Sequence, residues 1–260
     1  LLDTMTPLDF LEFRNLLTPA SGFQSVQFRM VEATLGLKIS GRHQKEYYKR
    51  TNEGGFEEDD YKKINMIEGN HHLLQLINSW LERLPFFENE FWLEYESQFP
   101  RLTDLHPFWS DYRMIYKTGL TPKEAGKIHD FDFIFLEQQS TNHNAETQAE
   151  PALSAKALRA ALFIMLYRDF PVFQTSYQIL DSLVEIDHQM ATWRHKHLVM
   201  VRRLIGLRMG TGNTSGRGYL EGALNSHYIF KDIAGLSTFL IERRKLPALP
   251  DKLIRNLSYS

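Results

Sequence analysis

One long helical pattern, over residues 178–208, constrains the fold of this chain more than any other feature of its sequence. Mostly apolar residues recur along it at alternating intervals of three and four, which is the spacing of one face of an α-helix. They are Leu183, Ile186, Met190, Trp193, His197, Met200 and Leu204. The pattern therefore predicts a long helix whose apolar face carries a single histidine, His197.

Helix signals continue through most of the remaining chain. Thr6 as N-cap, Pro7 at the first helical position and Asp9 in the first turn predict a helix start. Ser154 is expected to cap another helix, which is apolar enough to lie in the core. Further helical patterns lie in residues 71–84 and 23–37, with Val26, Met30, Ala33 and Leu37 on one face of the latter. Strand-like alternation is scarce, so the predicted fold class is all-α.

The organisation of the chain follows from the segments between these helices. Two polar stretches, residues 40–63 and 137–151, are expected to be exposed connections. The second ends a region, residues 85–150, that also carries clusters of aromatic residues and is expected to be a variable insertion. We therefore expect a single domain over residues 1–260 with an inserted subdomain of helices and loops.

The composition limits the kinds of partner. With 43% hydrophobic residues among 260, the chain can bury one sizeable core, and a net charge of -2 gives no strong field to attract nucleic acid or an anionic membrane. The absence of cysteine excludes disulfides, thiolate ligands and a cysteine nucleophile. No signal peptide or apolar run of membrane-spanning length is found, so a cytoplasmic protein is expected. Because the chain opens close to a helix start, we also expect further sequence upstream.

His197 admits two interpretations. On the pattern alone, a histidine on an apolar face is more often a core residue satisfied by a hydrogen bond than a ligand. Its neighbours Trp193 and Met200, and the lack of a second histidine one turn away on that face, favour one axial bond to a flat apolar cofactor over a zinc site. Haem is the candidate cofactor. His188 and His195 lie off this face and are expected at the surface.

Three segments resemble a known family. They are ASGFQSVQFR (residues 20–29), WRHKHLVMVRRLIG (193–206) and GTGNTSG (210–216), preceded by MTPLDFLEFR and followed by LSTFLI. In this order they are similar to the signature segments of tryptophan 2,3-dioxygenase, an all-helical haem b family whose members are usually homotetramers. The resemblance covers the chain except its variable middle. It implies a helical bundle that encloses a haem.

The resemblance also implies roles for individual residues. His197 would be the proximal haem ligand, and Arg14 would bind the substrate carboxylate. Thr211 would contact the ammonium and carboxylate of the substrate, and Phe10 would line its pocket. Two further residues, Ser21 and Gly22, would lie near the indole and the haem.

The residue types suit these roles. Phe10 and Arg14 are four apart, so one helix face offers an aromatic wall and a guanidinium that can bind a carboxylate bidentately, although an arginine standing alone is more often a surface ion-pair partner. The glycines around Thr211 permit close backbone approach, and the hydroxyl and amide side chains among them can hydrogen-bond a zwitterion. A flexible helix end is the alternative for this segment. A phosphate-binding loop is disfavoured because the required lysine is missing.

Two departures from the family pattern bear on function. Asn213 and Thr214 stand where the family usually has glycine and serine, which adds bulk and restricts the backbone. The family's distal histidine lies in an N-terminal stretch that this sequence lacks, and His71 and His72 are better explained as a polar helix start. We expect a dioxygenase that cleaves the indole C2–C3 bond of L-tryptophan with O₂. The alternatives are a related haem-dependent aromatic oxygenase with another substrate, and a non-catalytic haem or tryptophan sensor.

Assembly can be predicted in two ways. The stretches FFENEFWLEYESQFP and HPFWSDY hold many aromatic residues, which mark either subunit contacts or a locally packed subdomain. The pattern does not separate these alternatives. The family resemblance favours the first and predicts a homotetramer.

Overall fold

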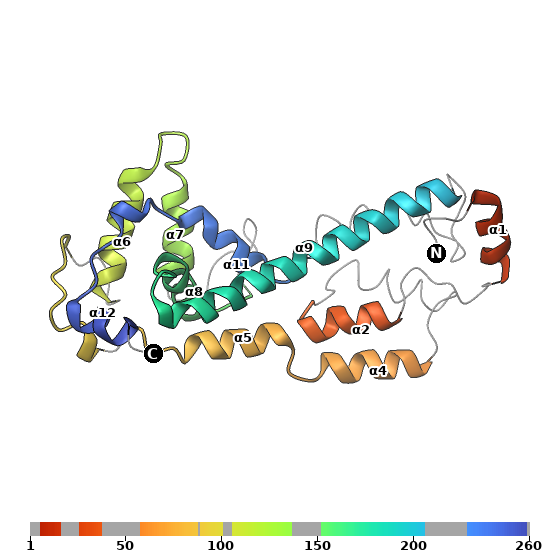
Figure 1. Cartoon of the computed structure of the whole chain (residues 1–260), viewed down its shortest axis with the longest axis horizontal. Helices are drawn as coiled ribbons and strands as arrows, with labels where there is room; N and C mark the ends of the chain where they lie inside the picture. Colours follow the sequence, from red (N-terminus) through yellow and green to blue (C-terminus); the bar gives the residue numbers. More distant parts are fainter. Residues whose placement is uncertain are drawn as a thin grey trace. The chain divides into compact units, whose positions relative to one another are not determined.

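The structure is a computed structural model of the chain, and it describes residues 6–16, 26–37, 58–87, 89–100, 106–136, 152–205 and 228–258. Every regular element within these ranges is a helix, which confirms the predicted all-α class (Figure 1). The α-helices are α1 (Pro7–Leu16), α2 (Val26–Leu35), α4 (Glu58–Glu68), α5 (Leu73–Glu82), α6 (Pro107–Gly119), α7 (Lys127–Phe135), α8 (Ala155–Leu166), α9 (Pro171–Ile205), α11 (Lys231–Gly235) and α12 (Asp251–Ser258). Short 3-10 helices occupy Asn89–Phe91, Leu236–Phe239 and Arg243–Lys245.

The chain divides into two compact units. The first comprises Leu1–Leu76 and Glu185–Ile229, and the second comprises Ile77–Val184 and Phe230–Ser260. Two helices, α5 and α9, contribute residues to both units. The expectation of a single domain over residues 1–260 with an insertion at 85–150 stays a prediction.

Helix starts follow the predicted capping residues. The Thr6 hydroxyl accepts a hydrogen bond from the Asp9 backbone N–H at 3.2 Å and donates one to the Asp9 carboxylate at 2.6 Å, so α1 begins as predicted. The Ser154 hydroxyl accepts from the Ala157 backbone N–H at 3.2 Å and caps α8. Both starts are therefore set by short side chains that satisfy otherwise unpaired amides.

The end of α2 is closed by a glycine. Gly36 has a φ of 112°, and its N–H lies 3.1 Å from the carbonyl oxygen of Ala33. The N–H of Leu37 donates to the carbonyl oxygen of Glu32 at 2.9 Å, which completes a Schellman motif. A Cβ at Gly36 would lie 2.6 Å from Nδ1 of His72 and 2.9 Å from the Cβ of Leu74. Glycine is thus required here by backbone conformation and by the neighbouring start of α5.

Two predicted boundaries were wrong. Residues 58–63, expected in an exposed connection, form the first part of α4. Asp59, Lys62 and Lys63 are exposed, while the helix buries Ile64 and packs against α2. The long helix begins at Pro171, earlier than the predicted residue 178, since proline is favoured in a first helical turn and Phe173 is buried. The other polar stretch, residues 137–151, lies outside the described residues.

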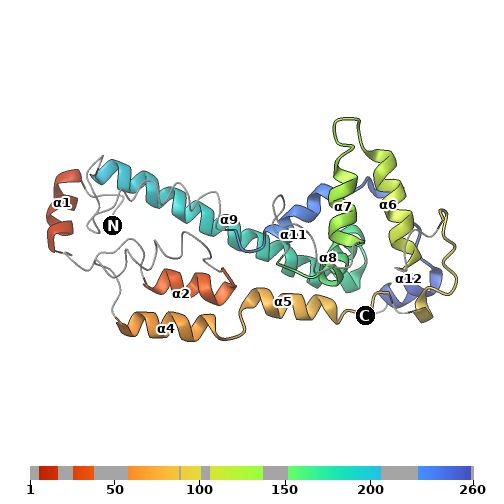
Figure 2. The same ribbon diagram turned by 180° about the vertical axis from the view of Figure 1, so that it is seen from behind.

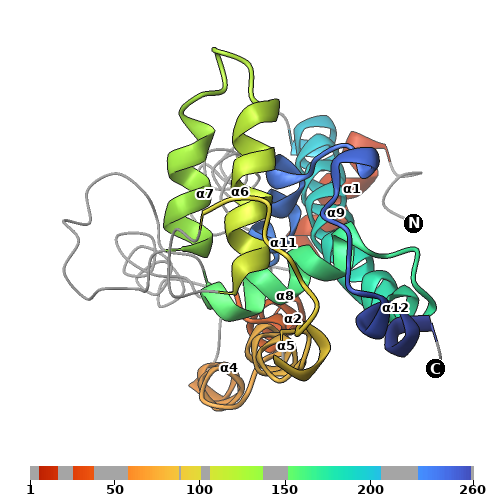
Figure 3. The same ribbon diagram turned by 90° about the vertical axis from the view of Figure 1, so that its left-hand side faces the viewer.

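Aromatic side chains form the core of the second unit. Phe87 packs against Trp92, Phe108 and Phe163 with ring centroids 5.1–5.9 Å apart. α7 packs against both α6 and α8, and Figures 2 and 3 show α6 and α7 side by side. Most of the aromatic residues in the two stretches that suggested subunit contacts are buried or half-buried in this core. Local packing, the second alternative, therefore accounts for them.

None of the helices in the described part of the chain combines the length and apolar character needed to cross a membrane.

Candidate haem-ligand site

The buried face of α9 is displaced from the predicted apolar face. Leu183, Met190 and Leu204 are buried as expected, but Trp193 is 45% exposed and His197 is half-buried. Among the described side chains between Leu183 and Leu204, the other buried ones are Asp187, Arg194 and Leu198. The rotation has a polar cause, since Asp187 accepts a hydrogen bond from the Ile229 N–H at 3.0 Å and Arg194 pairs with Glu32. His197 consequently lies at the edge of the packed face.

Three rings stack beside each other at this edge. The ring of Phe28, on α2, lies 4.1 Å from that of Trp193 with an angle of 19° between the planes. Trp193 in turn lies 5.3 Å from the imidazole of His197, one helical turn later, at an angle of 5°. We call Phe28, Trp193 and His197 the ring stack. It brings the end of the first signature segment against the start of the second.

The imidazole of His197 suits a metal ligand. Burial lowers its pKa below the usual 6.5, so the ring is neutral at pH 7 and has a lone pair to donate. Among the described residues, no three histidine, aspartate or glutamate side chains lie close enough together to hold a metal ion. A single neutral imidazole beside an indole and the half-buried Met200 is a donor set that fits haem, which takes one axial ligand and apolar surroundings from the protein.

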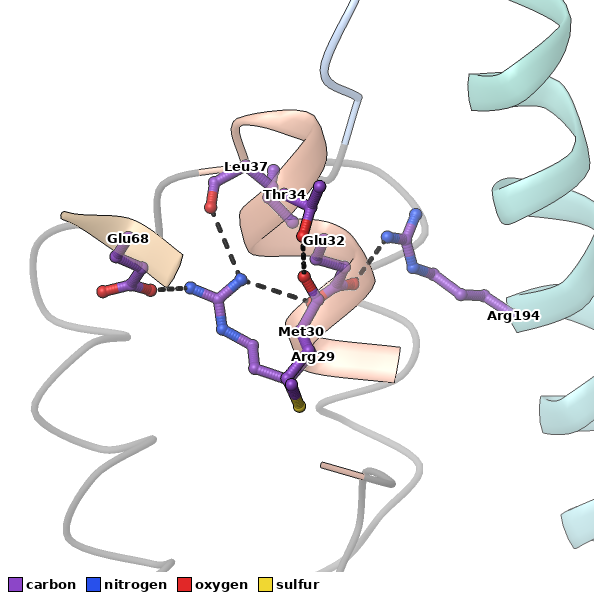
Figure 4. A network of polar contacts seen from close by, with 7 residues as sticks. All are labelled: Arg29, Met30, Glu32, Thr34, Leu37, Glu68 and Arg194. Carbon is purple, nitrogen blue, oxygen red and sulfur yellow. Dashed lines mark hydrogen bonds and ion pairs between the residues drawn. The ribbon is translucent and has the colours of Figure 1, made fainter. Parts of the chain in front are cut away.

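A chain of buried charges joins the three helices of this region (Figure 4). Arg29 on α2 pairs with Glu68 on α4, lies 3.7 Å from Glu32, and donates to the carbonyl oxygen of Leu37 at 3.4 Å. Arg194 on α9 donates to Glu32 at 2.8 Å. The charges alternate in sign along Glu68, Arg29, Glu32 and Arg194, which we call the charge chain. Of these four, all but Glu68 are almost completely buried.

Burial dominates the protonation of Glu32. It raises the pKa of this carboxyl above the usual 4.5, and the hydrogen bond and positive charge of Arg194, with the charge of Arg29, partly oppose the rise. Arg194 also lies over the ring of Phe28, 5.7 Å from its centroid. The ion pair between α2 and α9 is therefore in direct contact with the ring stack.

The other predicted site residues are only partly described. Phe10 is half-buried on α1, and the backbone of Arg14 lies one turn later on the same helix. The side chain of Arg14 lies outside the described residues, as do Ser21, Gly22 and Thr211. The two departures from the family pattern, Asn213 and Thr214, also lie outside them. The roles of these residues stay predictions.

Four other histidines, interpreted from the sequence as surface residues or as a helix start, lie as predicted. His188 and His195 are exposed on α9. His71 is exposed, and His72 begins α5 as its N-cap: its Nδ1 accepts from the Gln75 N–H at 3.2 Å, while its own N–H donates to the Gln75 side chain at 3.3 Å. These two residues form a helix start, as the sequence indicated.

The charge chain was missed from the sequence. Arg29 and Arg194 stand inside the two signature segments, but a charged residue in a helix is ordinarily a surface residue. The spacing of Asp187 and Arg194 was a usable signal. The two residues are seven apart, and each directly follows a residue of the predicted apolar face. Two charges repeating at two helical turns lie on one side, where both can be buried only if each has a partner.

Comparison with known proteins identifies the family. The family model described as tryptophan 2,3-dioxygenase matches residues 1–240. The chain is 39% identical to tryptophan 2,3-dioxygenase of Dictyostelium discoideum, over 100% of this chain and 66% of that protein. It is 38% identical to the enzyme of Bdellovibrio bacteriovorus, over 99% of this chain and 73% of that protein. Tryptophan 2,3-dioxygenase B of Danio rerio is 35% identical, over 95% of this chain and 61% of that protein.

These relatives come from a slime mould, a bacterium and a vertebrate, and all carry the same enzyme name. The chain spans between 61% and 73% of their lengths. Together with the family match, they confirm the resemblance stated from the signature segments. The chain belongs to the tryptophan 2,3-dioxygenase family.

Proposed function

We propose that this chain is a haem-dependent oxidoreductase that opens the indole ring of L-tryptophan. The reaction inserts both atoms of O₂ across the C2–C3 bond and yields N-formylkynurenine, so every atom of the two substrates is retained in the product. Family membership supports this reaction. The observation within the chain that carries it is the neutral, half-buried imidazole of His197, held in the ring stack.

His197 is the residue that would hold haem b, through its imidazole. When bound, the haem supplies the redox-active iron that O₂ chemistry requires. The contribution of the chain is to keep the His197 imidazole unprotonated and oriented, and to place indole beside the haem, which raises the effective concentration of the reacting groups. Trp193 and Met200 provide the apolar contacts that a haem face needs.

The amino-acid end of the substrate is assigned to the N-terminal helix and the glycine-rich segment. We assign the carboxylate to Arg14 and both polar groups of the zwitterion to Thr211, because a guanidinium fork and a hydroxyl match these charges. Phe10 would form a wall of the indole pocket, with Ser21 and Gly22 near the indole and haem. The backbone of α1 supports part of this, since it places Arg14 one helical turn after Phe10.

Homotetrameric assembly and a cytoplasmic location belong to the same proposal. The family resemblance supports the tetramer, and the absence of cysteine means that no oxidising compartment is needed for disulfide formation. The proposed partners are L-tryptophan, O₂ and further copies of the chain, with no role for nucleic acid or membranes. Sedimentation at micromolar concentration tests the assembly, and a monomer mass there would contradict it.

Labelled oxygen tests the reaction. Turnover of L-tryptophan under ¹⁸O₂ is expected to give N-formylkynurenine carrying two labelled atoms. One labelled atom would indicate an oxygenase of another kind, and haem and tryptophan binding without product would indicate a sensor. His197→Ala should abolish stoichiometric haem binding, whereas the exposed His195, replaced by alanine as the matched control, should leave the Soret band unchanged.

Tryptamine tests the assignment of Arg14, because it lacks the carboxylate. Arg14→Ala should weaken tryptophan binding about tenfold to a few hundredfold and leave tryptamine binding nearly unchanged. Arg14→Lys should recover little, since an ammonium lacks the planar fork. Equal weakening of both ligands would make Arg14 a structural residue.

A further inference from the structure

The charge chain is the strongest feature that the proposed reaction does not use. It runs from Glu68 through Arg29 and Glu32 to Arg194 and so connects α4, α2 and α9 (Figure 4). Arg29 and Glu32 are each 1% exposed and Arg194 is 4% exposed. Charges this deeply buried are costly unless each is paired, so the chain holds its members in one arrangement.

The charge chain and the ring stack meet on neighbouring residues. On α2, Glu32 lies one turn after Phe28, and on α9, Arg194 directly follows Trp193. An ion pair at 2.8 Å and a ring contact at 4.1 Å therefore join the same two helical turns. A single contact would let α9 rotate about its own axis, whereas two adjacent contacts of different direction fix that rotation.

The direction of the His197 imidazole depends on this rotation. His197 lies three residues after Arg194 and four after Trp193, so its side chain projects from nearly the same side of α9 as the Trp193 ring. That ring is parallel to the imidazole within 5° and is itself stacked on Phe28. A change in the ion pair would therefore alter the direction of the His197 imidazole through the Trp193 ring.

We propose that Glu32 and Arg194 are positioning residues for the haem ligand. The pair fixes the rotation of α9 against α2, and Trp193, stacked between Phe28 and His197, passes this orientation to the imidazole. The inference rests on the proposed function, because it takes His197 as the iron ligand. It adds to that function a mechanical link between the first signature segment and the haem ligand.

Haem release and the iron–histidine bond test the proposal. Glu32→Gln keeps the size of the side chain but removes its charge, and Arg194→Lys keeps the charge but loses the planar fork. Both are expected to speed haem release about 10–100-fold, measured as transfer of haem to excess apomyoglobin, in line with the usual loss of metal affinity when a residue that orients a ligand is changed. The Fe–His stretching band of the ferrous protein should shift, while the helical circular dichroism stays unchanged.

Lys196→Met is the matched control. It also changes a charged residue of α9, next to His197 in sequence, but the Lys196 side chain is exposed. Haem release and the Fe–His band should therefore remain as in the wild type. An equal change in Lys196→Met would overturn the proposal, since any substitution on this turn of α9 would then have the same effect as one at Arg194.

A double-mutant cycle tests the route through Trp193. Trp193→Leu should speed haem release to a similar degree, and the variant carrying both Glu32→Gln and Trp193→Leu should be no worse than the worse single variant. Multiplying effects, or a lower denaturation midpoint in Glu32→Gln with haem release and the Fe–His band unchanged, would overturn the proposal. A wild-type chain that binds no haem would overturn the proposed function as well, which distinguishes the two failures.

Discussion

The two units of the chain have different interiors. In the first unit, the described residues with buried polar or charged side chains are Arg29, Glu32, His72, Asp187 and Arg194, and in the second they are Ser110 and Asp111. The second unit is filled instead by aromatic rings, among them Phe108, Trp109, Tyr112, Phe131, Phe135, Phe163 and Phe173. The signature histidine His197 lies in the unit with the charged interior.

The two interiors differ in how strictly they fix the rotation of each helix about its own axis. Apolar burial has no preferred direction, so an aromatic core stabilises packing without requiring one rotation of each helix. The donors of its buried hydrogen bonds are neutral: Asp111 accepts from the hydroxyls of Tyr95 and Ser97 and from two backbone amides, and the Tyr112 hydroxyl donates to the Phe239 carbonyl oxygen at 2.6 Å. Buried ion pairs lose much of their stabilisation when the partners turn apart. The first unit therefore has the more directional interior.

Removal of a central ring should have the largest effect on stability. Phe163 is fully buried and contacts the rings of Phe87, Phe108 and Tyr167. Phe163→Ala is expected to lower the free energy of unfolding by about 3–5 kcal/mol, because it removes apolar contact and leaves a cavity. Urea denaturation followed by circular dichroism measures this. Leu93→Ala, at an exposed position, should change it by less than about 0.5 kcal/mol.

Breaking the ion pair between α2 and α9 should lower the free energy of unfolding by nearly as much. Arg194→Met leaves the Glu32 carboxylate buried without its closest guanidinium, for a loss of about 3 kcal/mol in the same measurement. Replacing the pair by two apolar residues, Glu32→Leu with Arg194→Met, should recover most of this stability, which would make the first interior resemble the second. Haem affinity should not recover.

An exposed ion pair provides the control for this change. Arg243 and Asp169 are 67% and 59% exposed and lie 3.0 Å apart in the second unit. Asp169→Asn should cost less than about 1 kcal/mol, because solvent screens the pair. If both pairs contributed equally, burial would not be the reason that the charge chain matters.

How much of the structure could be predicted from the sequence depends on whether an interaction is local or long-range. The helix starts at Thr6 and Ser154 were predictable, because capping depends on residues a few positions apart. Long-range pairing was not: Arg194 and Glu32 are far apart in the chain, and nothing local distinguishes them from surface charges. For this reason the predicted buried face of α9 includes Trp193, whereas the structure buries the neighbouring Arg194 instead. His197 could be predicted as a ligand because its chemistry stands out on that face, whereas its supporting residues do not.

A pH titration should separate the two interiors. The Glu32 pKa is raised above 4.5 by burial, so the folded state holds its proton more tightly than the unfolded state. Its contribution to stability is thus present below pH 4.5 and is lost as the pH rises through the raised pKa, by about 1.4 kcal/mol for each unit between the two values. Glu32→Gln should abolish this dependence, seen as a change in its stability relative to the wild type over that window.

The aromatic interior should lack such a dependence near neutrality. Burial raises the pKa of Tyr112 and Tyr167 above their usual 10, so both hydroxyls stay neutral until alkaline pH. Tyr112→Phe nevertheless should lower the free energy of unfolding by about 1 kcal/mol, because it leaves the Phe239 carbonyl oxygen without its donor. Tyr228→Phe, at an exposed position, is the control in urea denaturation and should cause no change.

The turn at Gly36 limits how this chain can vary. A side chain there would have to tolerate a φ of 112° and would also collide with His72 and Leu74. These obstacles are independent, so no single second substitution relieves both: a smaller residue at position 72 or 74 makes room but leaves the backbone strained. His72 is in turn needed to cap α5. We therefore expect sequence drift to change the surfaces of α2 and α5 freely while the glycine between them remains, because every one-step replacement meets both obstacles at once.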